Sequence, residues 1–268
     1  MPPTVRKAYL DLPWGQLHYR CAPGPSAAQP LVLLHQSPLS SRNYERLLPL
    51  LAAETRPYAI DTPGYGGSSV VPEHWEVADY AQVVWDLADA LGAEKIALFG
   101  RATGAVFALE AALAQPQRTR CLILHGMPVY TDAERAERMA NFAPPFQLGD
   151  DGAHLMGIWN RIHTEYPWIG PELATHFTRD FLAAGPDFAR SYRAIWRYDL
   201  PHRARGNLTV PTLLIGGTAD RIAFMHARAV ALLPQAEAMV LEGATDFVAE
   251  QDAALFARHV GAFVARHP

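Results

Sequence analysis

The sequence predicts an α/β protein built on a doubly wound, mostly parallel sheet, with a helical insertion late in the chain. Short apolar runs of strand length alternate with amphipathic segments of helix length over most of the 268 residues. The alternation stops between residues 129 and 205, where no strand-like run occurs, and then resumes. We therefore expect one core domain formed by residues 1–128 and 206–268, with residues 129–205 as a helical cap.

The first segments predict a hairpin, a strand and a helix. Residues 5–21 alternate in polarity and turn at Trp14-Gly15, a pattern typical of two antiparallel strands. Residues 30–35 (PLVLLH) are continuously apolar, as expected for a strand buried on both faces. Residues 43–53 (NYERLLPLLAA) have helical spacing.

The following segments continue the alternation. Residues 56–69 (RPYAIDTPGYGGSS) predict a strand that ends in a Pro/Gly loop, and residues 78–91 predict an amphipathic helix. Residues 98–105 (LFGRATGA) lie between the apolar runs KIALF and VFALEAALA and predict a sharp strand–turn–helix elbow. In one large enzyme fold such an elbow presents a catalytic nucleophile at its middle position. Here that position is Ala102, which carries no reactive side chain.

The last segments resume the same pattern around the insertion. Strands are expected within residues 120–126 (RCLILHG), 210–220 (VPTLLIGGTAD) and 238–247 (AMVLEGATDF), and helices at residues 224–233 and 254–265. In doubly wound sheets ligands bind at the carboxyl ends of the strands, so the cap is expected to lie over that edge.

Composition excludes several function classes. The net charge is −4 without a Lys/Arg block, so no nucleic-acid partner is predicted. The apolar runs are shorter than the ~20 residues that cross a bilayer, and the N-terminus does not resemble a secretion signal. Cys21 and Cys121 lack metal-type spacing. We expect a cytoplasmic protein whose partner is a small-molecule substrate; no oligomeric state is indicated.

The order of motifs resembles the α/β-hydrolase fold superfamily over nearly the whole chain. Residues 33–38 (LLHQSP) are similar to its His-Gly-x-Pro oxyanion loop, and residues 61–69 to the loop after the next strand. FGRATGA is similar to the nucleophile elbow. GGTAD, residues 216–220, ends at the usual acid position, and EGATDF, residues 242–247, covers the usual histidine position.

The resemblance implies a divergent catalytic site. A member of the superfamily needs a nucleophile, a base and an acid that orients the base. Asp220 matches the acid, although a helix N-cap is an alternative role for it. The nucleophile position holds Ala102, and the base position holds Asp246. The usual serine and histidine are therefore both absent.

Three explanations of Ala102 remain open. A serine changed to alanine is disfavoured, because restoring it would leave Asp246, with an ordinary pKa of ~3.9, in place of the imidazole. Secondly, some sequences that resemble this one have a His-Thr-Gly elbow, and a histidine at 102 beside Asp246 and Asp220 would make an acid–base site. Thirdly, alanine is the natural residue, and other groups perform the chemistry or none does.

The loops beside the elbow supply candidate binding groups. The backbone N–H groups of Thr103, at a helix N-terminus, and of Ser37 are candidates for an oxyanion hole. Gln36 replaces the usual glycine and is either a carbonyl-binding or a structural residue. The resemblance implies that His35 supports this loop.

Two further core residues and part of the cap are candidates for the site. His125 ends a strand near the expected pocket and has either a catalytic or a structural role. Arg101 is expected either to face the ligand or to pair with a surface acid. The cap is rich in aromatic residues, which indicates an apolar pocket. Its candidate wall residues are His154, Trp159, His163 and Trp168.

These observations predict an enzyme that acts on a small, largely apolar carbonyl compound, namely an ester, a lactone or an activated C–C bond. Its non-standard site favours either hydrolysis or an acid–base lyase or decarboxylase step, and this chain is inactive if Ala102 replaces an essential residue. The alternative is a ligand-binding protein that lost its chemistry. No cofactor or metal is expected, because the sequence has neither a Gly-x-Gly-x-x-Gly loop after the first buried strand nor a metal-ligand cluster.

Overall fold

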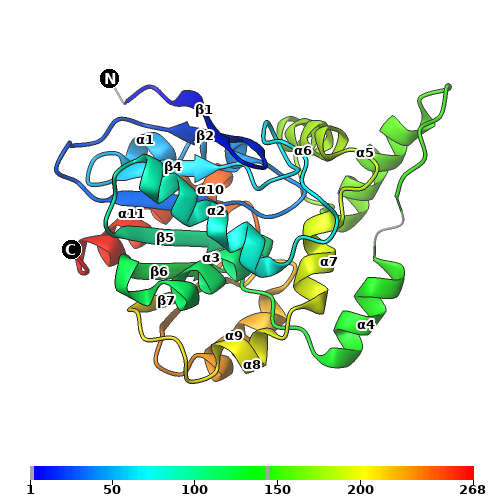
Figure 1. Cartoon of the computed structure of the whole chain (residues 1–268). Coiled ribbons are helices and arrows are strands. Elements are labelled where there is room, and N and C mark those ends of the chain that lie inside the picture. Colours follow the sequence, from blue (N-terminus) through cyan, green and yellow to red (C-terminus); the bar gives the residue numbers. More distant parts are fainter. Residues whose placement is uncertain (1–2, 143–144) are drawn as a thin grey trace.

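An eight-stranded sheet forms the centre of the computed structural model, which describes residues 3–142 and 145–268 (Figure 1). The strand order is β1-β2-β4-β3-β5-β6-β7-β8. The expected hairpin is β1 (Arg6–Leu12) and β2 (Gly15–Cys21), and β2 also pairs with β4 in antiparallel fashion. All other pairs are parallel, which confirms the doubly wound sheet. The parallel strands are β3 (Pro30–Leu34), β4 (Arg56–Ile60), β5 (Ile96–Arg101), β6 (Thr119–His125), β7 (Thr212–Gly217) and β8 (Glu237–Leu241).

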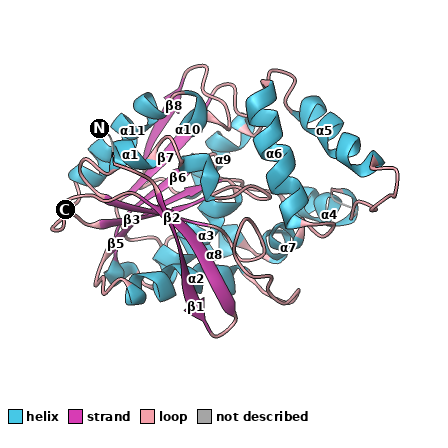
Figure 2. Ribbon diagram, turned by 90° about the horizontal axis from the view of Figure 1, so that it is seen from above, coloured by secondary structure: helices cyan, strands magenta, loops and turns pink. Residues whose placement is uncertain are grey.

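Helices cover both faces of the sheet because successive strand residues point in opposite directions (Figure 2). In β3, Val32 and Leu34 belong to the apolar cluster shared with α2 (Val77–Ala90), α3 (Thr103–Ala114) and α9 (His226–Leu232). Leu31 and Leu33 belong to the opposite cluster, with α1 (Leu48–Leu51), α10 (Val248–Gln251) and α11 (Ala253–Ala265). Burial on both faces explains the continuous apolar run of this strand.

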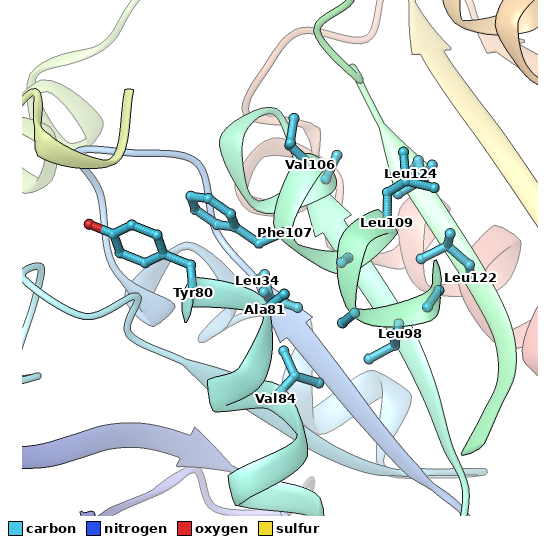
Figure 3. Packing of buried hydrophobic residues seen from close by; sticks show 14 of the residues in the cluster. Leu34, Tyr80, Ala81, Val84, Leu98, Val106, Phe107, Leu109, Leu122 and Leu124 are labelled. Atoms are coloured by element: carbon cyan, nitrogen blue, oxygen red, sulfur yellow. The ribbon is translucent and has the colours of Figure 1, made fainter. Parts of the chain in front are cut away.

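Helix α3 is enclosed by the sheet and α2 (Figure 3). Its Phe107 stacks on Tyr80 of α2 with ring centroids 4.8 Å apart. Val106 and Leu109 lie near Leu122 and Leu124 in the same cluster. This packing holds the elbow that precedes α3.

The helix expected over residues 43–53 is divided into two short pieces. A 3-10 turn at Ser41–Tyr44 is followed by α1, which is only four residues long. Pro49 lies in the first turn of α1 and has no backbone N–H to donate to the preceding turn, so a continuous helix cannot form through it. The helix expected at residues 224–233 likewise begins as a 3-10 turn, Ala223–Met225, before α9.

In the described part of the chain five helices lie between β6 and β7, and Figures 1 and 2 both place α4 to α7 to one side of the sheet. No strand occurs in the described part of residues 129–205. The helices are α4 (Asp132–Asn141), α5 (Ala153–Glu165), α6 (Pro171–Ala184), α7 (Arg190–Arg197) and α8 (Leu200–Ala204). Their apolar cluster includes Leu39, Tyr65 and Phe247 of the core, so these helices pack directly on the sheet domain. Of the helices described, none is both long enough and apolar enough to cross a membrane.

The elbow requires glycine on both sides of Ala102. A Cβ atom at Gly104 would lie 2.4 Å from the Leu34 carbonyl oxygen and 2.6 Å from that of His35. A Cβ atom at Gly100 would lie 2.3 Å from the Gly104 carbonyl oxygen. The two glycines therefore let α3 approach β3 and β5 closely.

We expect Gly104→Ala to lower the free energy of unfolding by about 3 kcal/mol, because the methyl group meets backbone atoms that cannot rotate away. Gly157→Ala in α5 is the matched control, since a Cβ atom there meets nothing within 4 Å. The control should be neutral or more stable by up to ~1 kcal/mol through helix propensity. Urea unfolding measures both, and equal effects would contradict the close-packed elbow.

Candidate active site

The elbow has the backbone expected of a site that presents a side chain. Ala102 has φ 47° and ψ −112°, and it is the one non-glycine residue with positive φ in the described part of the chain. Its N–H donates to the His125 carbonyl (3.0 Å), and its carbonyl accepts from the Ala105 N–H (2.9 Å). Such strain costs about 1–3 kcal/mol and is typical of functional positions. The backbone thus keeps a nucleophile elbow although residue 102 has only a methyl group.

A cavity of about 170 Å³ lies over the elbow. The core contributes Gln36, Ser37, Arg101, Ala102, Thr103 and Asp246 to its lining. The aromatic lining comes from Tyr130, Phe142, Tyr166, Phe177, Phe181, Phe188, Tyr192 and Phe224. Six of the residues expected from the sequence therefore meet in one cavity.

Arg101 contacts two buried carboxylates at the floor of this cavity. Its Nη2 lies 2.9 Å from Asp220 Oδ2 and 3.6 Å from Asp246 Oδ2. Its Nε donates to the Asp246 carbonyl (3.3 Å) and its Nη1 to the Gly126 carbonyl (3.2 Å). The sequence had indicated a ligand or a surface acid as the partner; the structure instead assigns the guanidinium to internal acceptors. Asp220 thus pairs with an arginine where the family pairs its acid with a histidine.

Gly126 makes room for this arginine. Its φ is +53°, and a Cβ atom would lie 2.2 Å from Arg101 Nη1 and 2.7 Å from Asp220 Oδ2. Any side chain here would displace the ion pair. Gly126, the last residue of RCLILHG, is therefore needed for Arg101 and Asp220 to pair.

The shared guanidinium leaves Asp246 easier to protonate than an ordinary aspartate. Burial and the nearby Asp220 carboxylate raise the pKa of Asp246, and Arg101 opposes this only in part. Burial lowers the pKa of Arg101, but the two carboxylates outweigh burial and raise it above its ordinary value. Asp246 and Glu165 are the two carboxyl side chains in the cavity lining, and Asp246 is the one that the core contributes.

The expected oxyanion hole is only partly free. The Ser37 N–H donates to Thr103 Oγ1 (2.7 Å), and the Thr103 hydroxyl donates to Ser37 Oγ (3.1 Å). The Tyr192 hydroxyl donates to the Ser37 carbonyl, and Ser191 Oγ lies 2.8 Å from Ser37 Oγ. The Thr103 N–H stands at the N-terminus of α3, where backbone N–H groups have no partner within the helix. Thr103 thus offers an N–H donor, whereas Ser37 does not without rearrangement.

Neither candidate histidine of the core lines the cavity. His35 Nδ1 lies 2.9 Å from the Gln36 carbonyl, and its Nε2 accepts from the Thr62 N–H (2.9 Å), so His35 braces the loop. Burial lowers the pKa of His35. His125 packs against Phe256 with ring centroids 5.1 Å apart. Burial and then Arg101 hold the pKa of His125 well below its ordinary value, so this imidazole is neutral.

The four candidate residues of the cap do not line the cavity. Trp159 and His163 pack on each other with ring centroids 4.6 Å apart, and the Trp168 side chain is 41% exposed. His154 stacks on Phe146 instead (6.3 Å). The i,i+4 spacing of Phe177 and Phe181 in α6 was the signal that could have identified the aromatic wall.

Sequence reasoning also missed four charged residues of the lining: Arg138, Arg161, Glu165 and Arg221. Arg161 and Glu165 have the i,i+4 spacing of an ion pair, and Arg221 directly follows Asp220. Nothing in the sequence places Arg138 near the elbow. Over the described residues, no group of three or more His, Cys, Asp or Glu side chains is arranged to hold a metal ion.

Comparison with known proteins identifies the family of this fold. Residues 29–253 match the family model described as the alpha/beta hydrolase fold, and the chain belongs to this family. A 2-hydroxy-6-oxononadienedioate/2-hydroxy-6-oxononatrienedioate hydrolase of Pseudomonas putida is 37% identical over 127 residues, which cover 46% of this chain and 43% of that protein. A Bacillus subtilis protein named an uncharacterized carboxylesterase is 32% identical over 121 residues, 44% of this chain and 40% of that protein. The chain thus spans less than half the length of these curated relatives.

The fold extends over whole chains among solved structures. A hydrolase from Pseudomonas aeruginosa has a TM-score of 0.80 at 23% identity, with 97% of this chain and 98% of that chain covered. A naproxen esterase from Bacillus subtilis has a TM-score of 0.71 at 24% identity, with 98% and 92% covered. At these identities the likeness shows the fold alone.

We expect Arg101→Gln to destabilise the protein by about 3–5 kcal/mol, because it leaves two carboxylates buried without a cation. Adding Asp220→Asn should recover part of this loss, since one of the two charges is then removed. Arg118→Gln is the control: it removes a partly exposed guanidinium that pairs with Asp89 and donates to the Ala93 carbonyl, and it should cost about 1–2 kcal/mol. Denaturant unfolding of the wild type and these three variants measures the costs. Equal costs for Arg101→Gln and Arg118→Gln would contradict the role of Arg101.

A second titratable group makes the stability depend on pH. A small cavity of about 10 Å³ behind Arg101 is lined by Asn43, His125 and Glu250, and burial raises the pKa of Glu250 to about 8. The folded state prefers neutral Glu250, so its contribution is present at acid pH and is lost as the pH rises toward and through 8. Glu250→Gln should therefore reduce the fall in melting temperature between pH 6 and 9. Glu172→Gln, at an exposed carboxylate, is the control and should leave that fall unchanged.

Proposed function

We propose that this protein hydrolyses a small, largely apolar carbonyl compound by acid–base chemistry at Asp246, without a covalent intermediate at the elbow. The observation that carries the proposal is a carboxyl with a raised pKa in the same cavity as an elbow residue that has no nucleophile. Relatives named as an esterase and as a hydrolase support this reaction class. The aromatic lining supports an apolar substrate.

The chemistry follows from the positions of Asp246 and Thr103. Ionised Asp246 accepts a proton from a water molecule as the water oxygen attacks the carbonyl carbon. The carbonyl oxygen becomes an oxyanion, which the Thr103 N–H and the N-terminus of α3 stabilise. When the tetrahedral intermediate collapses, Asp246 returns the proton to the leaving group. The products are an acid and an alcohol, and no bond to the protein forms.

A second candidate function is ligand binding without turnover. It is favoured by the hydrogen bond from the Ser37 N–H to Thr103 Oγ1, which occupies one donor of the expected oxyanion hole. In that case the cavity would bind a ligand, and no group at the elbow would react with it.

The test is hydrolysis of a panel of aryl esters and lactones, followed by product analysis. Asp246→Asn should lower kcat/KM by about a hundredfold or more, because the amide cannot accept the proton. Asp180→Asn is the matched control: burial also raises the pKa of Asp180, but its carboxylate accepts from Ser40 and does not line the cavity. The rate should rise with pH as Asp246 ionises, with an inflection above the ordinary range of an aspartate.

Substitutions at the elbow discriminate among the alternatives. Ala102→Ser should bring no large gain, since no imidazole lies beside it to activate a serine. Activity that appears only with Ala102→His would contradict the carboxylate mechanism and favour an imidazole base at the elbow. Tight binding of a substrate analogue with no turnover in any of these proteins would favour the binding protein.

A further inference from the structure

The charged lining of the cavity is asymmetric. Besides Arg101 and Asp246, the charged groups of the lining are the guanidiniums of Arg138, Arg161 and Arg221 and the carboxylate of Glu165. Glu165 contacts Arg161 (Nε–Oε1 2.8 Å) and also pairs with Arg221 Nη1. Arg138 Nε lies 3.7 Å from Glu137 Oε2, so three guanidiniums of the lining share two carboxylates. This part of the cavity carries excess positive charge.

The guanidinium of Arg161 is held among aromatic rings. Its Cζ lies 5.1 Å from the ring centroid of Phe188, 5.3 Å from that of Phe181 and 5.6 Å from that of Phe142. Its Nε donates to Glu165, whereas its two terminal nitrogens have no hydrogen-bond partner within residues 3–142 and 145–268. The rings cover part of the Arg161 side chain, which is 30% exposed, and a partly desolvated charge attracts an anion more strongly than one in water does.

Arg221 links this region to the catalytic floor. Its backbone N–H donates to Asp246 Oδ1 (3.3 Å), while its guanidinium lies over the Tyr166 ring, 4.9 Å from the centroid. Burial lowers the pKa of Arg221, but Tyr166 and Glu165 outweigh burial, so the group is charged at any pH of interest. A ligand that reaches Arg221 is therefore also close to the segment that carries Asp246.

We infer that the cavity selects substrates that carry a carboxylate, with Arg161 and Arg221 as specificity residues for that group. The planar guanidinium binds a carboxylate through two parallel hydrogen bonds, a geometry that neutral molecules cannot match. The volume of about 170 Å³ compares with the ~150 Å³ in which another protein holds one benzene ring. An anion with a single ring or a short chain is the matching size. The catalytic half of this inference rests on the proposed function; the binding half does not.

The test compares benzoate with its neutral isostere benzamide by isothermal titration calorimetry. Benzoate should bind about tenfold more tightly than benzamide, and high salt should weaken benzoate alone. Arg161→Gln and Arg221→Gln should each lower benzoate affinity about tenfold and leave benzamide unchanged. Arg161→Lys keeps the positive charge but loses the two parallel N–H groups of the guanidinium, so the loss of benzoate affinity should be smaller. Arg193→Gln is the control, because Arg193 pairs with Asp187 and does not line the cavity.

The outcomes separate this inference from the proposed function. Melting curves establish that each variant is folded, and Arg161→Lys provides a test if a glutamine variant is not. Equal binding of benzoate and benzamide, or an unchanged benzoate affinity in folded Arg161→Gln and Arg221→Gln, would overturn the inference. Arginine-dependent benzoate binding without turnover of 4-acetoxybenzoate would uphold it while refuting the proposed hydrolysis. Equal turnover of 4-acetoxybenzoate and 4-acetoxybenzamide, with binding that does not depend on Arg161 or Arg221, would uphold the proposed hydrolysis and refute the carboxylate specificity.

Discussion

The buried guanidinium of Arg101 joins the carboxyl ends of four neighbouring strands, and the two buried acids of this region are arranged around it. Arg101 ends β5, and its acceptors follow β6 (Gly126), β7 (Asp220) and β8 (Asp246). Two carboxylates cannot both remain ionised at such close range in the interior without a cation between them. The two acids in turn raise the pKa of Arg101 above its ordinary value, so the guanidinium stays charged. Asp220, at 2.9 Å, is its closer partner; Asp246, at 3.6 Å, is held more loosely and faces the cavity.

The pairing of Asp220 with Arg101 differs from the arrangement of a Ser-His-Asp site. In a Ser-His-Asp site the acid orients an imidazole, which in turn activates the serine. Here the acid is occupied by a permanent cation that cannot transfer protons at ordinary pH. Asp246 is then the core carboxyl that lines the same cavity as Ala102. The cavity lining has Asp246 on the core side and the guanidiniums of Arg138, Arg161 and Arg221 elsewhere, so under the proposed function a ligand with an anionic end would bind in one orientation.

Much of the fold could be predicted from local sequence patterns. Each buried strand was identified by a continuous apolar run, because a parallel strand covered on both faces has no polar side to interrupt it. The elbow was recognised because Gly100 and Gly104 are needed where α3 approaches the sheet. The error over residues 43–53 arose because the apolar spacing is helical there while Pro49 prevents a continuous helix. Spacing reports which face is buried, but it does not report whether the backbone hydrogen bonds can form.

The candidate site was predicted less completely, for a different physical reason. Six expected residues meet in the cavity, but the partners of Arg101 and the phenylalanines of α6 were not anticipated. Trp159 and Trp168 were predicted as pocket walls because tryptophan is large and rare. The size of a side chain, however, does not decide which face of a helix it lies on. Trp168 is largely outside the packed interior, whereas Phe177 and Phe181 lie on the stripe of α6 that turns inward.

The sequence by itself determined the α/β layers, the elbow, the absence of a side-chain nucleophile at residue 102 and the presence of acids at residues 220 and 246. These properties are local, since each depends on neighbours within a few turns of chain. Only the tertiary structure decided that Arg101 pairs with Asp220 and Asp246, more than 100 residues away, and that Arg161 and Arg221 share Glu165 at the cavity. Those contacts depend on strand order and on how the helices between β6 and β7 pack against the sheet domain. Ion pairs between distant segments produce no repeating pattern in the sequence. Which charges meet is therefore known only from the folded structure.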